Sequence, residues 1–179
     1  MENENKFSIL FQILGSEQQI LQRADQKAFT MLSLLGVFSV FFVIHYTKIP
    51  ATALTLTVIF LYFIAILASI YFLVMVVSPR IRDTEEKTLH EEKTIVPTFF
   101  GGIVKYKSSD DYAKKLEATL EDPDFTYEVF AKSVYSIGRI NAFKSKYLKY
   151  GIYSFVIAIS LEFIVIIALY VNLTLQTYR

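Results

Sequence analysis

Two long stretches without a formal charge constrain the fold of this chain more than any other feature. The first runs from Ala28 to Tyr46 and the second from Ala51 to Val77, and neither contains Asp, Glu, Lys or Arg. The first stretch would rise about 28 Å as an α-helix, close to the ~30 Å thickness of a bilayer's hydrocarbon core. The segment between them, around Lys48 and Pro50, leaves room only for a tight turn. The pattern therefore predicts two membrane spans that form a helical hairpin.

A third apolar stretch follows much later, from Tyr150 to about Val171, and its only charged residue is Glu162. The chain is 54% hydrophobic, which is too apolar for a soluble domain of 179 residues. We therefore predict an all-α protein with three transmembrane helices and a cytoplasmic helical region between the second and third. The third span is expected to continue a long cytoplasmic helix. The net charge of +1 argues against binding to nucleic-acid polymers.

The basic residues are distributed unevenly about these spans. Sixteen of the eighteen Lys and Arg residues lie before the first span or between the second and the third. The positive-inside rule places those segments in the cytoplasm and leaves Lys48 and the C-terminal tail outside. The expected organisation is a cytoplasmic amphipathic helix at 1–27, a transmembrane hairpin at 28–79, a cytoplasmic helical region at 80–149, a third transmembrane helix at 150–172 and an outside tail at 173–179.

Helix-capping residues mark the cytoplasmic region between the second and third spans. Ser108 and Ser109 precede two acidic residues, which is typical of a helix N-terminus. Asp122 and Pro123 are expected to end that helix. Asp124 is then expected to cap the next one.

Spacing of apolar residues predicts long helices on both sides of the membrane boundary. The amphipathic segment before the first span has helical spacing, and a break near Gly15 is one option. A seam with alternating steps of four and three begins after Asp124 and predicts a single helix as far as Val171. Gly151 on that helix is either a point of close packing or a hinge. The seam comprises Phe130, Val134, Ile137, Asn141, Lys144 and Leu148.

The stretch from Thr94 to Lys107 combines glycines, phenylalanines and lysines without an acidic residue. One interpretation is an apolar loop that packs on the helices beneath it. The other is a ligand loop in which glycine amides approach an anion, a phenylalanine stacks on a base and a lysine meets a phosphate. No Gly-Lys-Ser/Thr follows at the spacing of a Walker A motif. The candidate ligand residues here are Phe99, Phe100, Gly101, Gly102, Lys105 and Lys107.

Glu162 is the most unusual residue of the third span, because a carboxyl group near the middle of a bilayer costs several kcal/mol unless it is neutral, paired or facing water. It shares one helical face with Gly151, Ser154 and Ala158, within about 80° of arc. One interpretation is structural, with a protonated Glu162 hydrogen-bonded to Ser39, Thr57 or Tyr62. The other is a pore-lining or oligomer-contact position. The sequence leaves both open.

Other candidate contacts lie at the cytoplasmic boundary of the membrane. Asp25 and Lys27 lie where the first helix enters the membrane, and Lys27 has the position of a positive-inside anchor. The alternative is that Asp25 pairs with Arg139 or Lys144 on the third long helix. Arg139 with Asn141, beside a basic loop, is also a candidate site for a phosphate. Otherwise these two residues are a solvated charge and a packing position.

An enzyme is not expected from this sequence. The chain has no cysteine, and its two histidines, His45 and His90, lie in different regions, which excludes Cys-ligated metals and gives no metal-ligand cluster. His90-Glu91-Glu92 lacks the second histidine of a zinc protease motif, and no Gly-x-Ser-x-Gly elbow occurs. A single intramembrane carboxylate has no dyad partner for proteolysis. We expect neither catalytic residues nor a cofactor.

Three motifs, taken together, resemble the membrane effectors of Pycsar-type cyclic-nucleotide anti-phage defence in bacteria. They are Ala24-Asp25-Gln26-Lys27-Ala28, Pro97-Thr98-Phe99-Phe100-Gly101 and the stretch SIGRINAFKSKYLKYG, and they cover most of the chain in order. The family's mid-chain motif usually has a histidine where this chain has Gly102. The resemblance implies a protein of the bacterial inner membrane that damages the membrane in response to a cyclic nucleotide from a cyclase encoded nearby.

Two classes of function remain at this level. In the first, the chain is a signal-gated effector, and it must be a homo-oligomer because three spans enclose too little space for a conducting path. In the second, it is a non-catalytic adaptor in the bilayer whose cytoplasmic helices dock a protein partner. A cyclase gene found beside the gene for this chain would favour the first.

Overall fold

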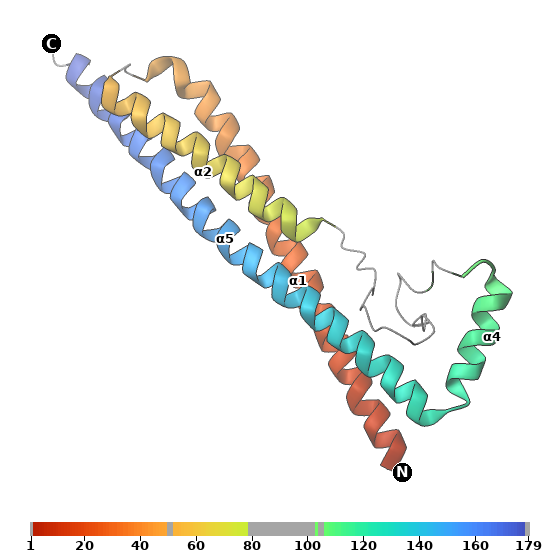
Figure 1. The fold of residues 1–179 in the computed structure, drawn as a ribbon. Coiled ribbons are helices and arrows are strands. Elements are labelled where there is room, and N and C mark those ends of the chain that lie inside the picture. The colour runs from red at the N-terminus through yellow and green to blue at the C-terminus, as the bar shows by residue number, and fades with distance from the viewer. Residues whose placement is uncertain (1, 50–51, 79–102, 104–105, 178–179) are drawn as a thin grey trace. The chain divides into compact units, whose positions relative to one another are not determined.

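The computed structural model describes residues 2–49, 52–78, 103 and 106–177. Within these ranges the chain forms four α-helices and a short 3₁₀ turn, and it contains no strand (Figure 1). The helices are α1 (Glu2–His45), α2 (Ala53–Val77), α4 (Ser109–Leu120) and α5 (Pro123–Thr177), and the turn η1 (Tyr46–Lys48) follows α1. The prediction of an all-α protein is confirmed.

Three of these helices, α1, α2 and α5, are long and apolar enough to cross a membrane. The predicted continuity of the third span with a long preceding helix is also confirmed, because α5 extends for 55 residues without interruption. Its bounds are wider than the predicted 124–171. The break considered near Gly15 does not occur, since α1 is continuous through that residue. A single glycine costs a helix only about 1 kcal/mol, which its neighbours readily offset.

The capping of α4 and α5 explains where each begins. Ser108 caps α4, with its hydroxyl accepting a hydrogen bond from the amide of Asp111 at 3.1 Å. The prediction that Asp124 caps the next helix is wrong. The Asp122 carboxylate accepts from the amides of Asp124 and Phe125 at 3.0 and 3.2 Å, so Asp122 is the cap. Pro123 then occupies the first helical position, where its missing N–H has no helical partner to lose.

The chain divides into two compact units, which are described separately. Unit 1 comprises Met1–Leu21 and Pro79–Ala142, and unit 2 comprises Gln22–Ser78 and Phe143–Arg179. Both α1 and α5 contribute one part to each unit. Unit 2 contains all of α2 and the apolar parts of α1 and α5.

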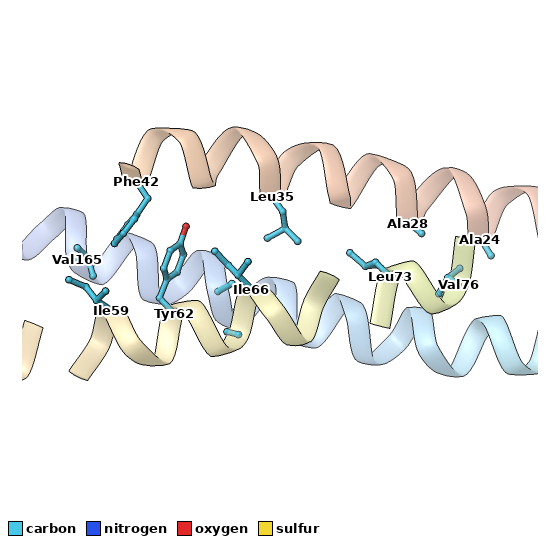
Figure 2. Close-up of a cluster of buried hydrophobic side chains, with 12 residues drawn as sticks. Ala24, Ala28, Leu35, Phe42, Ile59, Tyr62, Ile66, Leu73, Val76 and Val165 are labelled. Carbon is cyan, nitrogen blue, oxygen red and sulfur yellow. The ribbon is translucent and has the colours of Figure 1, made fainter. Parts of the chain in front are cut away.

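Unit 2 is a bundle of three helices, in which α2 runs antiparallel to the other two (Figure 1). Six of the eight buried residues of α2 recur in alternating steps of three and four, the spacing of a knobs-into-holes seam. Those residues are Ile59, Tyr62, Ile66, Ser69, Leu73 and Val76. Ala28, Leu35 and Phe42 of α1 approach them at intervals of seven, and Ala158 and Val165 of α5 complete the core (Figure 2).

Unit 1 contains the N-terminal part of α1, the helix α4 and the first part of α5. Two edge-to-face aromatic contacts connect α1 with α5. The ring centroids of Phe7 and Tyr127 lie 6.4 Å apart, and those of Phe11 and Phe130 lie 5.1 Å apart. The hydroxyl of Thr126 donates to the carbonyl of Thr119 at 2.5 Å, which closes the corner between α4 and α5.

Candidate functional site

Glu162 lies at the interface of α5 with α2, and its side chain is only 1% exposed. The hydroxyl of Tyr62 donates to one carboxyl oxygen, Oε2, at 3.1 Å, and Tyr62 is equally buried. The side chain of Ser39 in α1 also lies near the Tyr62 hydroxyl. Of the three partners expected for Glu162, Tyr62 is therefore in direct contact. The hydroxyl of Thr57 instead donates to the carbonyl of Ala53 in its own helix.

The second carboxyl oxygen of Glu162, Oε1, is buried without a hydrogen-bond partner. The surrounding side chains are apolar. Phe42 lies against the Tyr62 ring at a centroid distance of 4.7 Å, and Ala158 and Val165 flank Glu162 on the buried face of α5. Figure 2 shows the Tyr62 hydroxyl among these apolar residues, between the helices.

Gly151 is a point of close packing. An added Cβ atom at this residue would lie 2.7 Å from Cδ2 of Leu73, which is itself fully buried. The hydroxyl of Ser69 donates to the carbonyl of Gly151 at 3.3 Å. The predicted small-residue face is therefore placed against α2 at Gly151 and Ala158, whereas Ser154 is half-buried.

Asp25 and Lys144 form an ion pair at the start of the apolar stretches in unit 2. The ammonium of Lys144 lies 2.5 Å from Oδ1 of Asp25, with side-chain exposures of 6% and 28%. Of the two bases considered for Asp25, the structure brings Lys144 to it. Lys27 is exposed, as expected of a residue that anchors a helix at the membrane surface.

Asn141 contacts α1 within unit 1. Its amide nitrogen donates to the carbonyl of Glu17 at 2.8 Å and to the carboxylate of Glu17 at 2.6 Å. Arg139 is exposed and points along a different face, where its guanidinium lies 6.0 Å from the Tyr135 ring centroid. The structure does not bring Arg139 and Asn141 together, because residues two apart on a helix face different directions.

Glu17 is a contact residue that the sequence analysis did not identify. It lies three residues after Leu14 and four before Leu21, in the same alternating spacing that leads through Ala24 to Ala28. A charged residue at such a position is a signal for a polar contact across a helix pair. That signal was present in the sequence.

Five residues of the candidate ligand loop, Phe99, Phe100, Gly101, Gly102 and Lys105, lie outside the described residues. Lys107 is described and is exposed, just before the Ser108 cap of α4. Next to it, burial raises the pKa of Tyr106, and the nearby Tyr112 raises it further. The Tyr106 phenol is therefore neutral at physiological pH and provides no negative charge for Lys107.

A comparison of the sequence with models of protein families shows to which family this chain belongs. Residues 9–171 match the family model described as Pycsar effector protein domain. The chain belongs to this Pycsar effector family. The match covers most of the residues of both units. Neither a curated protein nor a solved structure matches the chain.

This Pycsar effector is a multi-pass membrane protein and a membrane effector of anti-phage defence. The described residues contain no group of three or more His, Cys, Asp or Glu side chains that could hold a metal ion. Their polar contacts instead connect helices within each unit. Glu17 contacts Asn141 in unit 1, and Tyr62 contacts Glu162 in unit 2. Such contacts can fix the register of helices and favour one packing over another.

Proposed function

We propose that this chain acts as a homo-oligomer in the bacterial inner membrane and permeabilises that membrane when a cyclic nucleotide binds. The observation that supports the proposal best is α5 itself, an uninterrupted helix of 55 residues that carries buried polar contacts in both units. A rigid helix transmits rotation or translation along its length. A ligand that prefers one packing of the first part of α5 would therefore bias the packing of the span.

Oligomerisation follows from the number of spans. Three helices packed about one core leave no path for ions between them, because the core side chains fill that space. A conducting path needs several copies around an axis, as in the cyclic symmetry of most homo-oligomers. Permeabilisation of the membrane therefore requires a change in how the copies pack.

The ligand is proposed to bind where basic residues occur without acids, at 93–107 and 129–149. Lys107 and Arg139 are exposed and available to a phosphate, whereas Lys144 is neutralised by Asp25. Asn141 belongs to the contact with Glu17, and a ligand that used its amide would have to displace that carboxylate. The Phe-Phe-Gly-Gly segment at 99–102 remains the proposed site for the base.

The proposed topology, with the N-terminus and 80–149 in the cytoplasm, can be tested directly because the chain has no cysteine. Thr47→Cys lies in the turn after α1, and Ser109→Cys lies at the start of α4. A membrane-impermeant maleimide added to intact cells should label Thr47→Cys, and it should label Ser109→Cys only after lysis. Labelling of Ser109→Cys in intact cells would reverse the orientation.

The function is tested with the purified chain in vesicles that contain a fluorescent dye. Cyclic purine and pyrimidine nucleotides are added separately, and dye release is followed. We expect release with at least one cyclic nucleotide and none with its linear monophosphate. Arg139→Ala should raise the nucleotide concentration needed about tenfold, a loss typical of one charge-assisted contact. Lys114→Ala, which removes an exposed base of α4 outside the stretches 93–107 and 129–149, should leave it unchanged.

If no cyclic nucleotide releases dye and the chain is monomeric in lipid, the proposal is wrong. The chain would then be better explained as an adaptor that docks another protein.

A further inference from the structure

The carboxyl group of Glu162 has no lysine or arginine within the spans to balance a negative charge. The stretches 28–46 and 51–77 contain no Lys or Arg, and the base nearest to Glu162 in its own helix is Lys149. Thirteen residues of helix separate the two, a rise of about 20 Å. Lys48 precedes α2, and Tyr62 lies nine residues after the first residue of α2, a further rise of roughly 14 Å. An ionised Glu162 would have no counter-ion from this chain at its own depth.

The groups around Glu162 are hydroxyls, contributed by two other helices. Tyr62 of α2 donates to Oε2, and Ser39 of α1 lies near the Tyr62 hydroxyl, so the cluster takes one side chain from each helix of unit 2. The other neighbours that α1 and α2 present are apolar. His45, one turn beyond Phe42, is engaged elsewhere: its ring packs on Phe41, and its Nδ1 lies 2.9 Å from the Phe41 carbonyl.

The second carboxyl oxygen of Glu162, Oε1, indicates the protonation state of this side chain. Glu162 is 1% exposed, and Oε1 has no hydrogen-bond partner. A carboxylate in an apolar site with an unsatisfied oxygen is far less stable than the neutral acid, whose unsatisfied oxygen carries no full charge. The burial, the absence of a cation and the unpaired oxygen therefore all favour the neutral, protonated form of Glu162.

We propose that the Ser39–Tyr62–Glu162 cluster is an intramembrane proton-binding site. In the packed bundle Glu162 holds a proton and is uncharged. When α2 separates from α5, the O–H bond of the acid breaks, the proton passes to water, and the carboxylate that remains is hydrated. The bound proton thus acts as a latch that favours the packed bundle.

The hydroxyl partners suit such a site better than a basic residue would. A lysine would favour an ionised Glu162 by forming an ion pair with it, like the pair of Lys144 with Asp25. The Tyr62 and Ser39 hydroxyls can each donate or accept a hydrogen bond, so they accommodate the acid with its proton and also the carboxylate formed as the proton leaves.

The latch rests on the proposed function in one respect, because opening of the bundle is taken to accompany permeabilisation. The proton site itself can be tested without any nucleotide. The full-length protein in lipid at neutral pH is examined by infrared spectroscopy for the carbonyl stretch of a protonated carboxylic acid. We expect a band that is lost in Glu162→Gln and kept in Glu117→Gln, which makes the same change at an exposed position of α4.

Tyr62→Phe should shift this band to higher wavenumber, because the acid loses a hydrogen bond while the aromatic packing stays. Absence of the band from the wild-type protein would show an ionised Glu162 and overturn the proposal. A band unaffected by Tyr62→Phe would remove Tyr62 from the site and contradict the cluster as proposed. The three variants must retain the wild-type helical circular dichroism.

The latch is tested by dye release from the same preparations. Glu162→Gln has the size of the acid but no proton to release, so we expect at least tenfold less nucleotide-triggered release with normal assembly. Release equal to that of the wild type would disprove the latch. A wild-type protein that shows the infrared band but never releases dye would instead remove the proposed function and leave the proton site standing.

Discussion

Unit 2 buries thirteen apolar and four polar side chains, whereas the described part of unit 1 buries two apolar and four polar ones. The two apolar residues of unit 1 are Leu10 and Val129, and its buried polar residues are Thr119, Thr126, Ser133 and Asn141. Under the proposed topology unit 1 lies in water, where burial of apolar surface would stabilise it most, and yet its described core is largely polar. We infer that its helix contacts separate at a lower free energy than those of unit 2.

The buried polar groups also differ within unit 2. Near the ends of the apolar stretches a carboxylate is matched by an ammonium, in Asp25 and Lys144. Deeper in the bundle the carboxyl group of Glu162 is matched by a neutral phenol, that of Tyr62. We infer that depth in the membrane influences which partner suits an acid, because full charges become more costly away from water.

The largest loss of stability should come from removing one partner of the ion pair between Asp25 and Lys144. Asp25→Asn leaves the Lys144 ammonium buried without a counter-charge, which should destabilise unit 2 by about 3 kcal/mol. This is the lower end of the usual range, because Asp25 is 28% exposed. Thermal and chemical unfolding in detergent would measure the change. Lys132→Ala is the control, since its exposed pair with Glu128 should contribute less than about 0.5 kcal/mol.

An equal loss for these two variants would show that the Asp25–Lys144 pair is no more buried in solution than a surface pair. Asp25→Leu combined with Lys144→Met should recover most of the loss, because the uncompensated charge is then absent.

The second effect concerns close packing in unit 2. Gly151→Val places new atoms where Leu73 already lies, and over-packing of this kind should cost about 2 kcal/mol. Gly36→Val is the control, since no atom lies within 4 Å of a Cβ added at that residue. Unfolding of both variants in detergent gives the comparison. If Gly151→Val is as stable as Gly36→Val, Gly151 is a hinge and not a packing point.

The third effect lies in unit 1 and tests its capping. Asp122→Ala removes the acceptor for two amides at the start of α5 and should cost about 1 kcal/mol of local stability. Asp124→Ala removes only a first-turn acid, worth about 0.3 to 0.5 kcal/mol. Hydrogen exchange at the amides of residues 124–130 measures both. The reverse order of effects would restore Asp124 as the cap.

Sequence reasoning predicted the helices well because their signals are local. Runs without charge, cap residues and seam spacing all lie within one segment, and α5 was predicted almost to its ends. Asn141 and Lys144 were placed on the seam, and both are buried there. The cap of α5 was misplaced by two residues because both acids precede the helix, and the preference of proline for the first helical position was not applied.

Contact partners were harder to predict because they depend on the axial register between helices. The spacing around Glu162 fixed its face but left Ser39, Thr57 and Tyr62 as equal candidates, because it does not determine how far α1 and α2 are displaced along α5. Glu17 was missed for the same reason, since nothing local to it indicates that Asn141 lies opposite. The ligand loop at 99–102 lies outside the described residues, so its role is still a prediction.

The smallest effect compares two glycines that have open space around them, Gly15 in unit 1 and Gly36 in unit 2. In water a helix unfolds to a flexible chain, so Gly15→Ala should stabilise that part of α1 by about 0.5 to 1 kcal/mol. In a bilayer the separated spans remain helical, because no water satisfies their backbone groups, and Gly36→Ala should change stability by less than about 0.3 kcal/mol. Hydrogen exchange of each variant in lipid, read at the amides within one turn of the substitution, measures the difference. Equal gains at the two positions would mean that unit 1 does not open more readily to water than unit 2, and the contrast between them would fail.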